Sequence, residues 1–183
     1  MIFTETFIKG LFVIEPKVVG DSRGYFMETF KLGMFQKESG FSGEFVQENE
    51  SMSSKNVLRG LHFQKPPFAQ GKLIRVVHGS VRDVAVDIRK GSPTYGEYFS
   101  ILLSAENKKQ LWIPPGFAHG FLTLEDDTIF CYKCTNYYSK DDEGGLMYND
   151  PELQIDWGIE NPILSEKDKD YIPFKQFESP FNK

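Results

Sequence analysis

The sequence has few cysteines, few histidines and no long apolar run. Its two cysteines are too few for the disulfide framework of a small secreted domain. The N-terminal segment is largely apolar but carries Glu5, Lys9 and Glu15, so we expect no signal peptide. No stretch approaches the roughly 20 apolar residues that a transmembrane helix needs. We therefore expect a cytoplasmic protein that has no membrane partner.

The sequence also lacks an excess of positive charge. It has 21 Lys and Arg against 26 Asp and Glu, which gives a net charge of −5 and a pI of about 5.3. Proteins that bind the nucleic-acid backbone usually show a basic patch or a high pI, so we expect no nucleic-acid partner. A small anionic ligand stays compatible with this charge, because a few local Arg and Lys side chains suffice to bind it.

The sequence is long enough for one domain and is rich in aromatic residues. A chain of 183 residues can form a single domain over 1–183 and bury most of its apolar surface. Aromatic residues make up 15% of it, which favours a β-rich core or surfaces that stack on rings. Short runs of Val, Ile, Phe and Tyr alternate with turn residues, as is typical of all-β proteins.

These runs define the elements that we expect. Many short strands in one domain indicate a sandwich or barrel, and a jelly roll fits the length best. The predicted strands are 2–8, 12–19, 25–30, 45–52, 57–63, 72–78, 81–88, 97–104, 110–113, 119–124 and 128–135. The predicted helices are 31–39 and 165–171, the second capped by Ser165. The remaining segments are a loop at 139–151, a C-terminal tail at 172–183, and a strand-like arm at 1–25 that would pair with a partner subunit in a dimer.

The segment 57–64 carries polar side chains inside an apolar run. A lone His62 there would be a core histidine, but Arg59 and Gln64 lie close by, and buried polar groups are unfavourable unless they face a cavity. Strict alternation along a strand puts Arg59 and His62 on opposite faces. A bulge at Gly60 would bring them to one face.

The next two strands contain further charged candidates. Lys72 opens a predicted strand and shares a face with His78, which precedes a turn and is expected at the surface. Asp83 lies on an apolar face, and a buried carboxylate needs a partner. It would either orient a histidine ring or pair with an arginine.

The most distinctive segment is 114–121, in which a rigid turn delivers His119 to a strand. Its P-x-G-x-x-H spacing resembles the second half of the cupin signature. Metal-binding cupins add an H-x-H pair and a Glu, and no H-x-H pair occurs in this sequence. We therefore predict a cupin without a metal.

A C-x-x-C motif at Cys131 and Cys134 lies in a predicted strand, where its two side chains point to opposite faces. A redox role would need a helix N-terminus, so packing is the simpler interpretation. Tyr132 would line the barrel. Tyr137 and Tyr138 would pack or stack on a flat ring.

Several motifs together resemble the dTDP-4-dehydrorhamnose 3,5-epimerase family over about residues 2 to 170. They occur in the family's order: Asp21–Phe26, Val46–Asn49, Leu58–Gln64, Lys72, Val84–Arg89, Leu111–Phe121, Tyr132–Lys133 and Ser165–Asp168. The resemblance implies a cupin-type jelly roll and a homodimer with exchanged N-terminal strands. It also implies a cofactor-free epimerase in dTDP-L-rhamnose biosynthesis, whose substrate is a dTDP-4-keto-6-deoxyhexose.

The resemblance also implies roles for individual residues. His62 matches the general base, Asp168 its hydrogen-bonded partner and Tyr132 the general acid. Lys72 and His119 match positions around the reacting ketone and the sugar ring. The positions that match substrate-binding residues are Arg23, Phe26, Glu28, Gln47, Asn49, Arg59, Glu143, Tyr138, which would stack on thymine, and Lys167, near the diphosphate.

The chemistry of a 4-keto sugar suits these residue types. The ketone acidifies the hydrogens on both neighbouring carbons, so epimerisation needs a base on one face and an acid on the other. A histidine with a carboxylate partner suits the first task, and a tyrosine suits the second. An enolate forms between the two steps, and Lys72 would stabilise it.

Three alternatives stay open at this point. A single-position epimerase or keto-isomerase of the same family would share most of these motifs. A non-catalytic cupin that binds a sugar nucleotide would not need base, acid and lysine together. A metal-dependent cupin oxygenase would need a metal that analysis of the purified protein would detect.

Overall fold

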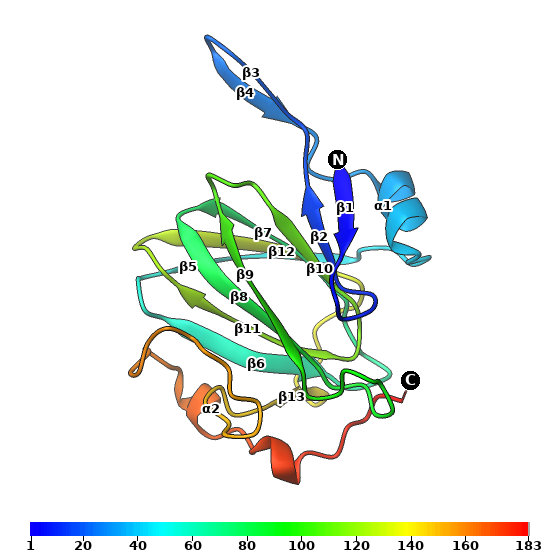
Figure 1. Cartoon of the computed structure of the whole chain (residues 1–183), viewed down its shortest axis with the longest axis vertical. Helices are drawn as coiled ribbons and strands as arrows, with labels where there is room; N and C mark the ends of the chain where they lie inside the picture. The colour runs from blue at the N-terminus through cyan, green and yellow to red at the C-terminus, as the bar shows by residue number, and fades with distance from the viewer. Residues whose placement is uncertain (183) are drawn as a thin grey trace.

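The chain, described by a computed structural model for residues 1–182, consists mainly of two antiparallel β-sheets that face each other (Figure 1). Two short helices, α1 (Leu32–Ser39) and α2 (Glu166–Lys169), and a 3-10 turn at Phe174–Gln176 accompany the sheets. The strands are β1 (Ile2–Glu5), β2 (Phe12–Glu15), β3 (Val18–Asp21), β4 (Gly24–Met27), β5 (Gln47–Ser53), β6 (Leu58–Gln64), β7 (Lys72–His78), β8 (Ser80–Asp87), β9 (Tyr98–Ser104), β10 (Gln110–Ile113), β11 (Phe117–Thr123), β12 (Thr128–Cys134) and β13 (Glu143–Gly145). None of the helices in this part of the chain has the length and apolar character that crossing a bilayer requires.

The order of the strands confirms the predicted cupin-type jelly roll. One sheet has six strands in the order β1-β2-β10-β7-β12-β5, and the other has five in the order β13-β6-β11-β8-β9. Neighbours in space are mostly distant in sequence, as expected for a jelly roll. The first sheet carries Lys72 and Tyr132, and the second carries His62 and His119, so the site residues face one another across the barrel.

Three apolar clusters explain the aromatic content. The first lies between the sheets and includes Phe121 and Phe130, which stack at 3.9 Å between ring centroids. The second covers the outer side of the five-stranded sheet and includes Trp157. The third joins Phe35 of α1 to Trp112 on the outer side of the six-stranded sheet. Most aromatic residues are therefore core, as predicted.

Several predicted boundaries differ from the structure. Strands predicted at 72–78 and 110–113 occur at those residues, whereas the one predicted at 12–19 splits into β2 and β3. The break falls at Pro16, which has no N–H to donate to a sheet and a fixed φ. The strand predicted at 2–8 ends at Glu5, because the Thr6 side chain hydrogen-bonds Ile8 in a turn.

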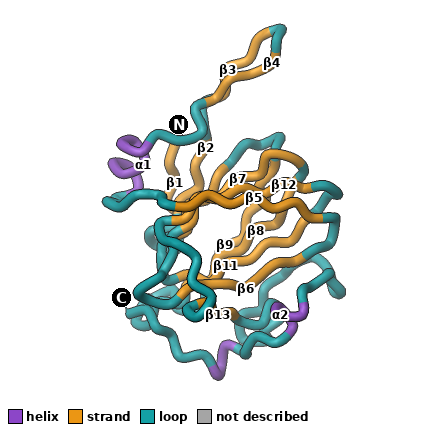
Figure 2. Tube along the Cα trace, turned by 180° about the vertical axis from the view of Figure 1, so that it is seen from behind, coloured by secondary structure: helices purple, strands orange, loops and turns teal. Residues whose placement is uncertain are grey.

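The C-terminal segments are more structured than the sequence indicated. The predicted loop at 139–151 contains β13, whose Gly145 pairs with His62 of β6. The expected tail beyond residue 171 packs instead of extending, since Phe181 is buried in the second cluster. Figure 2 shows this segment crossing beneath the barrel from α2. Lys183, the last residue of that predicted tail, lies outside the described residues.

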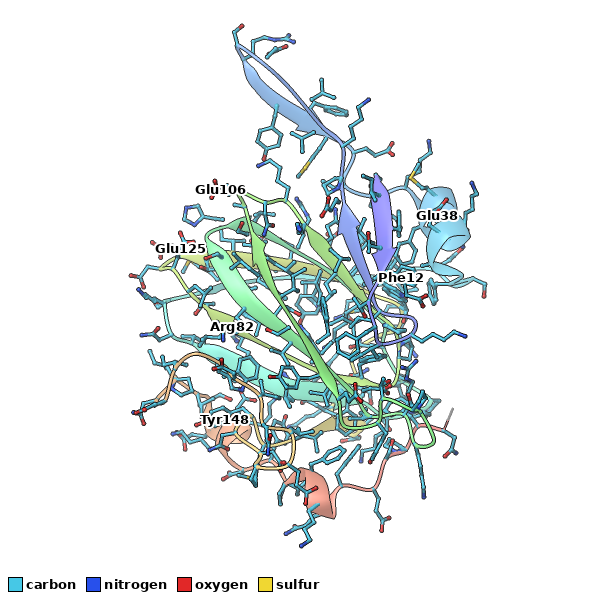
Figure 3. The ribbon with its side chains drawn as sticks, in the orientation of Figure 1. Phe12, Glu38, Arg82, Glu106, Glu125 and Tyr148 are labelled. Atoms are coloured by element: carbon cyan, nitrogen blue, oxygen red, sulfur yellow. The ribbon has the colours of Figure 1, made fainter. Side chains whose placement is uncertain are left out.

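The N-terminal segment divides into two parts. β1 and β2 belong to the six-stranded sheet through pairing of β2 with β10. Only β3 and β4 project from the barrel as a hairpin (Figure 1), which also stands clear of the sheets when side chains are drawn (Figure 3). The Nζ of Lys108 lies 4.3 Å from the centroid of the Tyr25 ring on this hairpin. Within the single chain, β1 and β2 of the predicted arm at 1–25 thus join the sheet, and the projecting part begins at Val18.

Candidate active site

A hollow between the two sheets brings most of the predicted site residues together. It comprises two adjoining cavities of about 310 Å³ each, which share His62, Lys72, Tyr132, Tyr138 and Glu143. The other predicted residues that line them are Gln47, Asn49, Arg59, His119 and Lys167.

A bulge at Gly60 turns Arg59 and His62 to the same side of β6. The pairing of β6 with β11 runs from His119–His62 to Phe121–Arg59, so β6 has one extra residue between these pairs. Gly60 takes a φ of +131°, and a Cβ there would lie 2.5 Å from the Cα of Gly120. Glycine is required at this position, and the predicted bulge is confirmed.

His62 is paired with a buried carboxylate. Its Nε2 lies 2.5 Å from Oδ1 of Asp168, which is 3% exposed and comes from α2. Burial alone would raise the pKa of Asp168, but the hydrogen bond and charge interaction with His62 bring this pKa below its usual value. Ser165 caps α2, as predicted, by accepting a hydrogen bond from the Asp168 N–H. An ionised carboxylate on Nε2 leaves Nδ1 to accept a proton.

Lys72 and Tyr132 lie on the six-stranded sheet, across the hollow from His62. The Nζ of Lys72 lies 5.8 Å from the centroid of the Tyr132 ring. Burial lowers the pKa of Lys72, and the charges of Asp83 and Glu143 oppose that shift. Burial also raises the pKa of Tyr132, so its phenol keeps its proton at neutral pH.

His119 lies at the bottom of the hollow with Asp83. Its Nε2 is 3.0 Å from Oδ2 of Asp83, and both residues are buried. Burial lowers the pKa of His119 although Asp83 attracts the imidazolium form. Asp83 therefore orients a histidine ring, whereas Asp87 pairs with Arg89 at 2.8 Å. Of the two partners that the sequence left open for Asp83, a histidine or an arginine, the structure shows the histidine.

A polar network lines the rim of the hollow. Glu143 accepts a hydrogen bond from the hydroxyl of Tyr138 at 3.0 Å and from the Nζ of Lys167 at 2.6 Å. Gln47 accepts a bond from the Tyr138 N–H and donates one to Asn49. The Tyr138 side chain is 55% exposed, so its ring stands at the mouth of the hollow and can stack on a flat ligand.

Three predicted residues are not near this hollow. Arg23 and Phe26 lie on the projecting hairpin, where Phe26 is 74% exposed and Arg23 forms an ion pair with Asp21. Glu28 follows the hairpin and is also exposed. Within one chain they do not contribute to the hollow.

The remaining histidine and the cysteines behave as predicted. His78 is exposed and hydrogen-bonds the carbonyl of Asp127. Cys131 contacts Glu50 and Cys134 contacts Asn49, so the two sulfurs lie on opposite faces of β12. Among residues 1–182, no group of three or more His, Cys, Asp and Glu side chains is arranged to hold a metal.

Sequence reasoning missed some lining residues. Ser51 continues the inward face of β5 that carries Gln47 and Asn49, and the period-2 rule would have found it. Gln70 precedes β7, outside any strand, so no strand periodicity in the sequence pointed to it as a lining residue. Tyr171 contacts His62 from outside the hollow. The only feature of the sequence that could have indicated this contact is that Tyr171 closely follows Asp168.

The family model described as dTDP-4-dehydrorhamnose 3,5-epimerase matches residues 5–176. The chain belongs to the dTDP-4-dehydrorhamnose 3,5-epimerase family. The resemblance seen in the motifs is thus confirmed, and the match spans both sheets and α2.

Curated relatives of this epimerase family cover nearly the whole chain. The dTDP-4-dehydrorhamnose 3,5-epimerase of Shigella flexneri is 55% identical over 164 residues, 90% of this chain and 91% of the relative. That of Methanothermobacter thermautotrophicus is 50% identical and covers 95% of each chain.

Solved structures from the family share the fold. The dTDP-6-deoxy-D-glucose-3,5-epimerase of Legionella pneumophila, in complex with dTDP-4-keto-L-rhamnose, is 45% identical with a TM-score of 0.94. The alignment covers 99% of this chain and 97% of that one. A 3'-monoepimerase from Streptomyces bikiniensis is more distant, at 31% identity and a TM-score of 0.86 over 92% and 86% of the two chains.

Proposed function

We propose that this protein catalyses the 3,5-epimerisation of dTDP-4-dehydro-6-deoxy-D-glucose to dTDP-4-dehydro-L-rhamnose, without a cofactor. The observation that carries this proposal is the His62–Asp168 pair facing Tyr132 and Lys72 across one hollow. Membership of the epimerase family supports the substrate class.

The positions of these groups support the following reaction. Nδ1 of His62 takes the proton from a carbon next to the C4 ketone, and Asp168 stabilises the imidazolium that forms. The ammonium of Lys72 faces the developing enolate oxygen. The Tyr132 phenol, whose pKa is raised by burial, returns a proton from the opposite face. Both C3 and C5 adjoin the ketone, so the same groups serve both carbons once His62 has released its proton to solvent and Tyr132 has regained one from solvent.

The nucleotide half of the substrate would bind at the rim. Tyr138 would stack on the thymine ring, and Lys167 and Arg59 would form charge-assisted hydrogen bonds with the diphosphate. Gln47, Asn49, Glu143 and His119 would contact the sugar and the ribose. These local cations let a protein of net charge −5 bind an anion.

A homodimer belongs to the same proposal. The β3–β4 hairpin projects away from its own barrel and exposes Val19, Tyr25 and Phe26, which favours burial against a second copy. Arg23, Phe26 and Glu28 would then reach the hollow of the partner. A cytoplasmic location fits a nucleotide-sugar substrate, and we include it in the proposal together with a single domain over residues 1–183.

The proposal is tested by incubating dTDP-4-keto-6-deoxy-D-glucose with the protein in deuterated water, with a chelator added. NMR of the sugar reports deuterium at C3 and C5 separately. Label at both carbons supports the double epimerase. Label at one carbon indicates a single-position epimerase, and label at neither carbon contradicts an epimerase.

A further inference from the structure

An aromatic ring stands directly behind the His62–Asp168 pair. Tyr171 follows α2, which carries Asp168, and its ring meets the His62 ring edge to face, with centroids 5.6 Å apart and planes at 68°. This is a favourable geometry for two rings. Asp168 restrains the imidazole at Nε2 alone, and the Tyr171 contact adds a restraint on the tilt of the same ring.

The Tyr171 ring is itself fixed by β13. A Cβ built on Gly145 would lie within 2.4–2.5 Å of three atoms of that ring, so the ring lies against the backbone of Gly145. Gly145 pairs with His62 in the sheet. The ring is therefore held between the strand that pairs with His62 and the His62 side chain.

A second hollow lies on the far side of Tyr171. It has a volume of about 530 Å³ and is lined by Phe63, Gly145, Tyr171, Ile172 and Phe177, among others. Phe63 and Glu143 line both hollows, and beside them the Tyr171 ring lies between the outer hollow and His62. Without the ring, water from the outer hollow would reach the His62–Asp168 pair.

The hydroxyl of Tyr171 does not explain this position. It is buried and makes no hydrogen bond of regular geometry with residues 1–182, and its interaction with the nearby Lys167 is weak, which is unfavourable for a polar group. Burial raises its pKa to about 12, so it holds its proton throughout the neutral range. A phenylalanine would make the same ring contacts and bury no hydroxyl.

We propose that Tyr171 is a positioning residue, whose ring holds the imidazole of His62 at its working angle and keeps water from the outer hollow away from the His62–Asp168 pair. This inference rests on the proposed function of His62 as the base. A misplacement of the base by about 1 Å can lower turnover by roughly 10²-fold. The Tyr171 hydroxyl interacts with Lys167 and Glu143 of the rim, and Tyr171→Phe lacks that hydroxyl as Tyr171→Leu does, so the ring's own contribution is read from kcat in the comparison of these two variants.

The test compares Tyr171→Leu and Tyr171→Phe with wild type in the epimerisation assay. We expect Tyr171→Leu to lower kcat about 10- to 100-fold and Tyr171→Phe to keep wild-type kcat, and any change in KM caused by loss of the hydroxyl should be the same in both variants. Ile172→Ala, at an exposed neighbour that lines the same outer hollow, is the matched control and should keep wild-type values. A normal kcat for folded Tyr171→Leu, or an equal loss in Tyr171→Phe, would overturn the inference.

A readout that does not depend on catalysis separates this inference from the proposed function. The chain has 3 histidines, so the ring signals of His62 can be assigned by replacing the others one at a time. We expect the His62 signals to shift and broaden in Tyr171→Leu and to stay in place in Tyr171→Phe and Ile172→Ala. Unchanged His62 signals in Tyr171→Leu would overturn the positioning role, whatever activity the variant shows.

Discussion

At the scale of single residues, the site depends on pairs that sequence spacing cannot reveal. His62 and Asp168 are 106 positions apart, and they meet because α2 packs beneath β6. His119 and Asp83 meet because β8 and β11 are neighbours in the sheet. The resemblance to a family supplied the first pair, whereas the residues alone left the partner of Asp83 open.

Removing the hydroxyl of Tyr132 should separate proton removal from product formation. In Tyr132→Phe we expect product formation to fall by about 10²- to 10⁴-fold, the usual contribution of a general acid. His62 is 25% exposed and can exchange its proton with solvent, so recovered substrate should still gain deuterium. NMR of substrate and product measures both quantities. If both fall together to zero, Tyr132 has a role other than proton return.

The lowered pKa of Lys72 predicts a limit on activity at high pH. Because burial favours the neutral amine, Lys72 loses its charge below the ordinary lysine pKa of 10.5, and kcat should fall as pH rises through that lower value. Lys72→Arg keeps a cation at every accessible pH, so its alkaline limb should move upward although kcat near pH 8 drops about tenfold. Profiles of kcat against pH check this. An unchanged alkaline limb in Lys72→Arg would assign that limb to another group.

At the scale of elements, one irregular strand creates the site. A regular β6 would send Arg59 and His62 to opposite faces, and the extra residue at Gly60 brings both into the hollow. The sequence indicated the need for this bulge, because polar residues in an apolar run require it. It could not indicate β13, whose Glu-Gly-Gly sequence has little strand propensity and pairs through its backbone with β6.

Replacing Gly60 should therefore damage both stability and activity. A methyl group in Gly60→Ala would meet the Gly120 Cα at 2.5 Å and the His119 carbonyl at 2.8 Å, at a φ of +131°. We expect a loss of at least about 2 kcal/mol in the free energy of unfolding. Urea unfolding measures it. In the control Gly33→Ala, nothing lies within 4 Å of the new methyl and the helix should gain about 0.5–1 kcal/mol. Equal stability of the two variants would contradict the bulge argument.

At the scale of the whole molecule, two-sheet architecture was predictable and the projecting hairpin was not. Alternating apolar strands separated by turn residues predicted the jelly roll and most strand positions. The same alternation in residues 12–27 could not show that β2 joins the barrel while β3 and β4 leave it, because this depends on pairing with β10. Arg23 and Phe26 are matched to the site by resemblance, and in one chain they are far from it.

Mixing two inactive variants tests whether the hairpin completes the partner's site. Arg23→Glu removes the hairpin's contribution to the partner's site, and His62→Ala removes the base from the hollow. Each homodimer should therefore be nearly inactive. A hybrid dimer has one site with both parts intact, and random mixing should restore about one quarter of wild-type activity. Activity equal to the sum of the separate variants, or a monomer by light scattering, would contradict the shared site.

Deuterium incorporation by His62→Ala, measured beside wild type and the exposed-histidine control His78→Ala, tests the central claim most directly. If His62 is the base for both carbons, wild type and His78→Ala label C3 and C5 of the 4-keto sugar, and His62→Ala labels neither above the background rate. Near-normal labelling at either carbon by His62→Ala would contradict the assignment of His62 as the base.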